Sequence, residues 1–148
     1  MDAARRSLRL GKKPLVFRPM EACLIVMVCS DLSEADQVSR QLSESNSGCL
    51  VTYQRVQDLI GNAPHGKVAL IILATNDLPA VVARTLRWLR QHWPRCPLTV
   101  VGDVGCGEHE MAAREGGACY LTRPIAPEQW TALLSHVLGG LKVDQRDK

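Results

Sequence analysis

Short apolar runs alternate with amphipathic segments along most of the chain. The apolar runs are predicted to be strands, over residues 22–28, 49–53, 68–74, 98–101 and 118–121. Continuous apolar strands are typical of a parallel sheet that is buried on both faces. The run VALIILA at 68–74 is the most hydrophobic of them, so it is predicted to be the central strand.

The intervening segments carry the spacing of amphipathic helices. Helices are predicted over 33–44, 56–61, from 79 onward, 108–115 and 127–138. Ser33 is the expected N-cap of the first helix, with Val38 and Leu42 facing inward. Gly139 and Gly140 are expected to end the last helix.

Five strand–helix units of this size predict an α/β fold: a doubly wound, five-stranded parallel sheet with strand order 2-1-3-4-5. An aliphatic core is expected, because the chain has only three tryptophans, two tyrosines and one phenylalanine. The apolar runs are too short to span a membrane. We therefore expect a cytoplasmic protein.

The net charge of +3 hides an uneven distribution. Residues 1–19 contain six basic residues and one acidic residue, a charge of +5, so the remainder carries −2. These features predict a basic, disordered tail at 1–19, a folded domain at 20–140 and a polar C-terminal tail at 141–148. Met20 is an alternative start, and contact with nucleic acid is expected only through the basic tail.

The six cysteines show no paired CxxC spacing, and the four histidines keep no metal-ligand spacing with them. Reduced thiols and the absence of a metal site are therefore expected. Cys29 follows the first predicted strand and is the thiol expected at the mouth of any site there.

Three segments resemble the receiver domains of bacterial response regulators, the family of the chemotaxis regulators. The stretch GGACYLTRPIAPE at 116–128 is similar to the fifth receiver strand and the turn after it. The sequence at 69–79, ALIILA followed by DLP, resembles the strand and turn that carry the phosphorylated aspartate, and PLTVV at 97–101 resembles the fourth strand. The resemblance covers 22–138 and implies the flavodoxin-like receiver fold.

The resemblance also implies a site at the ends of the strands. In a receiver, an acidic pair after the first strand and an acceptor aspartate after the third hold a Mg²⁺ ion. Cys29 and Ser30 stand at the pair, with Asp31 one position late. Thr75 stands at the acceptor position, with Asp77 two residues later.

The remaining receiver positions differ as well. Gly102 stands where a receiver has threonine or serine, and Arg123 replaces the lysine. Arginine keeps the charge but changes the geometry, and it is expected either to bind an anion or to pair with Asp31 or Asp77. The Arg123–Pro124 bond is cis in the family, and Mg²⁺ binding is not expected.

These departures predict a non-enzymatic pseudo-receiver, a phosphorylation-independent protein-interaction module in two-component signalling. Its expected partners are a histidine kinase, an output protein or a second copy of the chain, and they would contact a face that includes Tyr120 and Trp130. Packing in the core is the alternative for Trp130. One alternative is a weak phosphorylatable regulator that uses Asp31 or Asp77. A distant alternative is an S-adenosylmethionine-binding enzyme that uses the glycine-rich loop at 102–107, which contains DVGCG.

Overall fold

The computed structural model describes residues 23–45, 48–105 and 107–146. The basic tail at 1–19, Met20 and Cys106 lie outside the described residues. Ten elements follow one another: β1 (Leu24–Val28), α1 (Leu32–Ser45), β2 (Cys49–Tyr53), α2 (Val56–Gly61), β3 (Val68–Ala74), α3 (Pro79–His92), β4 (Leu98–Gly102), α4 (Gly107–Glu115), β5 (Cys119–Thr122) and α5 (Pro127–Arg146).

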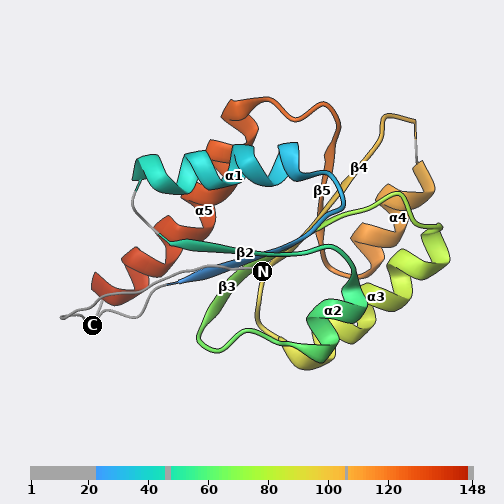
Figure 1. Cartoon of the computed structure of the whole chain (residues 1–148), viewed down its shortest axis with the longest axis horizontal. Helices are drawn as coiled ribbons and strands as arrows, with labels where there is room; N and C mark the ends of the chain where they lie inside the picture. Colours follow the sequence, from blue (N-terminus) through green and yellow to red (C-terminus); the bar gives the residue numbers. More distant parts are fainter. Residues whose placement is uncertain (1–22, 46–47, 106, 147–148) are drawn as a thin grey trace.

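The five strands form one parallel sheet in the order β2-β1-β3-β4-β5, as the sequence predicts. Helices α1 and α5 cover one face of the sheet, and α2, α3 and α4 cover the other (Figure 1). Alternate strand residues serve the two faces: Ile25 and Met27 pack under α1 and α5, whereas Val26 and Val28 pack under α2 and α3. The chain therefore forms the predicted doubly wound α/β fold.

Strand β3 is the central strand, as its composition predicts, and all of its residues after Val68 are buried. It pairs with β1 on one side and β4 on the other. The limits of β2, α2 and β3 match the predicted ranges. Among the described residues, no helix has both the length and the apolar character needed to cross a membrane.

The first helix begins earlier than predicted. Helix α1 starts at Leu32, and the carboxylate of Asp31 accepts hydrogen bonds from the backbone N–H of Ser33 at 2.9 Å and from its hydroxyl at 2.8 Å. Aspartate is a strong N-cap because it satisfies free backbone N–H groups in the first turn. Asp31, rather than Ser33, therefore caps the helix.

The last helix ends later than predicted. Helix α5 continues to Arg146, so residues 141–146 extend the helix instead of forming a separate tail. Glycine ends a helix when it adopts the left-handed conformation, and Gly139 does not. Inside a helix a glycine costs only about 1 kcal/mol, which the packing of Leu134 and Leu138 in the core offsets.

Candidate functional site

The carboxyl ends of four strands bring the predicted site residues to one edge of the sheet. Cys29–Asp31 follow β1, Thr75–Asp77 follow β3, Asp103 follows β4 and Arg123 follows β5. Ligands of open α/β sheets bind at this edge, beside the point where the strand order reverses. Here that point lies between β1 and β3.

The guanidinium of Arg123 lies at the centre of this edge. Its Nε donates to Oε2 of Glu34 at 2.8 Å, and its Nη2 donates to Oε1 of the same carboxylate at 3.2 Å. Its Nη1 donates to Oδ1 of Asp103 at 3.1 Å and to Oδ1 of Asn76 at 3.3 Å. One side chain thus joins α1 to the segments that follow β3, β4 and β5.

The pair between Arg123 and Glu34 is shielded from water. The side chains are 23% and 11% exposed, respectively. Burial by itself would lower the pKa of Arg123, but the hydrogen bonds and negative charges of Glu34 and then Asp103 outweigh it and raise the pKa. Two-pronged contacts between arginine and a carboxylate are the strong form of this interaction.

The predicted partners of Arg123 were wrong. Asp31 and Asp77 form no ion pair with it, and Glu34, Asp103 and Asn76 take that role instead. Sequence reasoning missed Glu34 although a signal was present. Glu34 stands four residues before Val38, on the inward-facing stripe of α1, where a carboxylate requires a buried partner.

Asp31 is occupied with capping α1. Its pKa lies below the usual range because the backbone N–H of Ser33, and then the Ser33 hydroxyl, hydrogen-bond its charged form. The N-cap role turns this carboxylate toward the start of α1. Ser30, the neighbouring residue at the expected acidic pair, is exposed.

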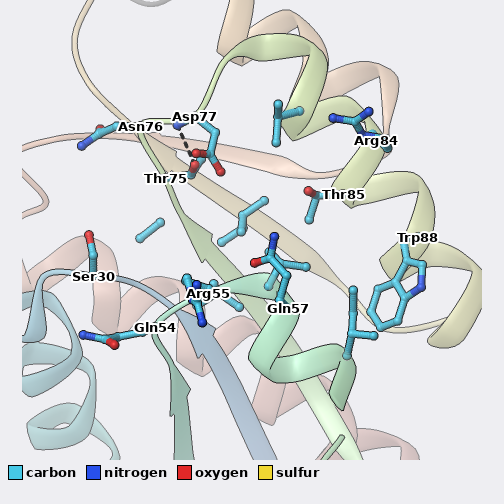
Figure 2. Close-up of a pocket in the computed structure, with 16 residues that line it drawn as sticks. Ser30, Gln54, Arg55, Gln57, Thr75, Asn76, Asp77, Arg84, Thr85 and Trp88 are labelled. Atoms are coloured by element: carbon cyan, nitrogen blue, oxygen red, sulfur yellow. Dashed lines mark hydrogen bonds between the residues drawn. The ribbon is translucent and has the colours of Figure 1, made fainter. Parts of the chain in front are cut away.

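Thr75 stabilises the turn after β3. Its side chain is buried, and its Oγ1 accepts a hydrogen bond from the backbone N–H of Asp77 at 2.8 Å, drawn as the dashed line in Figure 2. A ring nitrogen of His109 donates to the carbonyl of Asp77. Asp77 itself is exposed. Thr75 and Asp77 thus fix this turn, and the Asp77 carboxylate remains accessible to solvent.

The residues present do not fit a Mg²⁺ ion. Magnesium prefers carboxylate oxygens in octahedral geometry. The positions after β1, where a receiver has its acidic pair, instead hold the buried thiol of Cys29, the exposed Ser30 and the capping carboxylate of Asp31, and the cation of Arg123 lies at the same edge. In the described parts of the chain, no group of three or more histidine, cysteine, aspartate or glutamate residues is arranged to hold a metal.

Gly102 makes room for Tyr120. A Cβ atom at position 102 would collide with the Tyr120 hydroxyl, which donates to the backbone carbonyl of Asp103 at 3.4 Å. The ring of Tyr120 is therefore held inward, over the end of β4, and is half-buried. Gly105 takes a positive φ of 87° in the turn that follows. These two glycines of the predicted cofactor loop thus have structural roles.

Trp130 does not belong to an exposed face, contrary to the prediction. It is 0% exposed and lies in the core between α1, α5 and the sheet, where its indole N–H donates to Oε1 of Gln37 at 2.8 Å. Its position is the first of an inward series that continues with Leu134 and Leu138. The Arg123–Pro124 bond is cis, as predicted.

Cys29 is a buried thiol with a raised pKa. Burial first, and then the charges of Glu34 and Asp31, raise the pKa from 9.0 to about 11. Burial raises the pKa of Cys96 in the same way, also to about 11. Both thiols stay protonated in the folded state, so the stability they contribute is present at neutral pH and is lost as the pH rises from about 9 toward 11.

We expect iodoacetamide at neutral pH to label the exposed Cys49 and Cys119 at least about tenfold faster than Cys29, because the thiolate is the reactive form. Labelling of Cys29 should rise as the pH passes 9. Peptide mass spectrometry of the alkylated chain measures each rate. Equal rates for Cys29 and Cys49 at neutral pH would contradict the buried, protonated state.

A pocket of about 730 Å³ opens between the ends of β1 and β3 and the helices α2 and α3 (Figure 2). Ser30, Thr75 and Asp77 line it. Asp31, Arg123 and Pro124 instead line a second pocket of about 360 Å³ next to α1. The predicted site residues are thus divided between two hollows.

Solved structures of response-regulator receiver domains share this fold. The BeF3-activated receiver domain of DrrB from Thermotoga maritima is 20% identical, with a TM-score of 0.66, over 80% of this chain and 98% of that one. The chemotaxis regulator CheY4 of Vibrio cholerae is 18% identical, with a TM-score of 0.66, over 79% and 99%. The CheY-like protein TadZ of Pseudomonas aeruginosa is 15% identical, with a TM-score of 0.65, over 78% and 98%.

At these identities the likeness concerns the fold. No family model and no curated protein sequence matches the chain. The structural neighbours are CheY-like receiver domains, and their five-stranded sheet in the order 2-1-3-4-5 is the fold of this chain.

Proposed function

We propose that this chain is an atypical receiver domain, a non-enzymatic cytoplasmic module that signals through protein contacts without phosphorylation. The observation that carries the proposal is the ion-pair network of Arg123 with Glu34, Asp103 and Asn76. The receiver fold supports a place in two-component signalling. Its partners would be a histidine kinase, an output protein or a second copy of the chain.

The network supports independence from phosphate through its charge balance. A phosphorylatable receiver gathers carboxylates that need a cation, and after phosphorylation it gathers new negative charge around a lysine. Here one guanidinium already satisfies Glu34 and contacts Asp103. A fixed cation between carboxylates leaves little electrostatic attraction for Mg²⁺. It also joins the segments that a phosphoryl group would otherwise draw together.

The position of Tyr120 also supports a fixed state. Movement of loops and of an aromatic ring is the usual output of a receiver, and here Gly102 leaves room for the inward ring of Tyr120. An inward ring would present its surface to partners without the need for phosphorylation.

A second candidate is residual phosphorylation at Asp77. Its carboxylate is exposed at the sheet edge, beside the Thr75 position where a receiver has its acceptor. The nearest acidic residue after β1 is Asp31, whose carboxylate caps α1. This candidate therefore has an acceptor but lacks the pair that would hold its metal.

The test is an amide NMR titration of the whole chain with Mg²⁺ and then beryllofluoride, a mimic of a phosphoryl group. We expect no saturable shifts at Asp31, Thr75, Asp77 or Arg123. The receiver domain of DrrB, whose structure is BeF3-activated, is the positive control. Saturable shifts that spread to Tyr120 would overturn the proposal. Their loss in an Asp77→Asn variant would establish the second candidate.

A further inference from the structure

The pocket between α2 and α3 has the size and lining of a small-molecule site. Its volume of about 730 Å³ falls within the usual range for such sites, roughly 300–1,000 Å³. Its floor is apolar and consists of Val28, Leu73 and Ala74, the buried ends of β1 and β3. It opens at the point where the strand order reverses, which is where sheets of this class bind ligands.

The polar groups of the pocket converge from two sides. Figure 2 shows Gln57 of α2 and Thr85 of α3 directed into the space between the helices, with Arg55 and Arg84 on opposite sides of it. Trp88 lines the pocket from α3 and offers an aromatic surface. An apolar floor with a few converging polar groups favours a ligand that has one flat apolar part and one charged part.

The charge of the lining selects an anion. The lining contains two arginines, Arg55 and Arg84, and one carboxylate, Asp77, so its net charge is +1. Nη2 of Arg55 lies 3.6 Å from Oδ1 of Asp58, but both side chains are exposed, so this ion pair contributes little stability. Arg84 has no ion-pair partner among residues 23–45, 48–105 and 107–146. Its guanidinium is therefore available to a ligand.

Phosphate suits two guanidinium groups better than carboxylate does. One arginine fork already satisfies both oxygens of a carboxylate, whereas a phosphate has three terminal oxygens that two forks can share. We propose that this pocket binds a small aromatic phosphate, with the ring against the apolar floor and Trp88 and the phosphate between Arg55 and Arg84.

The pocket also touches the Arg123 network. Asn76 lines the pocket, and its Oδ1 accepts a hydrogen bond from Arg123 at 3.3 Å. A ligand that moves the turn after β3 would change this contact. The ligand would then be the input that replaces phosphorylation. This role rests on the proposed function, but the existence of the binding site does not depend on it.

The experiment titrates the whole chain with adenosine 5′-monophosphate and with phenyl phosphate, followed by amide NMR. Saturable shifts are expected at Gln54, Gln57 and Thr85 and at the Trp88 indole. Adenosine tests the ring part of the ligand alone, and inorganic phosphate tests the charged part alone. Both should bind at least about tenfold more weakly than adenosine 5′-monophosphate. For adenosine this factor corresponds to the loss of one charged hydrogen bond, about 1.4 kcal/mol. Inorganic phosphate instead loses the apolar contacts of the ring.

Two variants on α3 localise the site. Arg84→Gln should weaken binding of adenosine 5′-monophosphate about tenfold. The matched Arg87→Gln variant changes an exposed arginine of the same helix that does not line this pocket, and it should leave binding unchanged. The absence of saturable shifts with both aromatic phosphates, or equal effects of the two variants, would overturn the site. If saturable shifts occur in the pocket but not at Arg123, the binding site stands and its role as the input to signalling is rejected.

Discussion

A Trp130→Ala variant is expected to lose about 3–5 kcal/mol of unfolding free energy, the usual cost of truncating a large aromatic residue in a core. Trp130 is the largest fully buried side chain and lies between α1, α5 and the sheet. Domains of this size are stable by only about 5–15 kcal/mol. The variant would therefore lie near the limit of folding at ordinary temperatures.

The cost has two physical parts. Removal of the indole leaves a cavity between α1, α5 and the sheet, and the packed residues around it relax only partly to fill it. It also removes the hydrogen bond from the indole to Gln37. Gln37 is only half-buried, so water can replace that donor and the cavity dominates the loss.

Urea unfolding followed by circular dichroism measures this loss. Trp93→Ala is the control, because Trp93 is a half-buried residue just beyond the end of α3, and its truncation should cost about 1–2 kcal/mol. A loss below about 1 kcal/mol for Trp130→Ala, together with weaker binding of a partner, would restore Trp130 to an exposed docking face.

The sequence could predict the elements because each apolar run ends at residues that stop it. Strand β3 begins after the Pro64–Lys67 loop and ends before the polar turn at Thr75, so its limits follow from local composition. Trp130 was misplaced because the expectation came from the receiver resemblance, in which this face contacts partners. The i, i+4 series Trp130–Leu134–Leu138 instead indicates the core.

The partners of Arg123 could not be predicted in this way. Glu34 is separated from it by 89 positions, Asn76 by 47 and Asp103 by 20. Sequence position indicated only that an unpaired arginine near a strand end needs an acid. Asp31 looked nearest by analogy with receivers, but its carboxylate is used by α1. Two departures from the receiver pattern are therefore linked. Arginine stands in place of the lysine, and its acidic partner is Glu34 on α1 instead of an acid directly after β1.

An Arg123→Met variant is expected to lose about 3 kcal/mol. The substitution removes the cation and leaves the Glu34 carboxylate in a largely buried site without a counter-charge. Breaking a buried ion pair costs about 3–5 kcal/mol, and the partial exposure of Arg123 places this pair at the lower end. The Asp103 contact adds little, because that side chain is 57% exposed.

An exposed ion pair of similar length is the matched control. Nη2 of Arg114 lies 2.7 Å from Oε2 of Glu110, but the two side chains are 74% and 42% exposed, respectively. Water solvates both partners after the pair is broken, so Arg114→Met should cost less than about 1 kcal/mol. The difference between the two arginine variants would thus report burial rather than the loss of a contact.

The double variant Glu34→Met/Arg123→Met separates the pair from its surroundings. Replacing both charges by apolar side chains removes the uncompensated carboxylate, so the double variant should be more stable than Arg123→Met alone. Urea unfolding of the wild type, both single variants and the double variant gives the coupling energy, expected to be about 2 kcal/mol. Additive losses would mean that Arg123 stabilises the edge without Glu34. In that case the fixed cation that supports phosphate-independent signalling would have to be held by Asp103 and Asn76 alone.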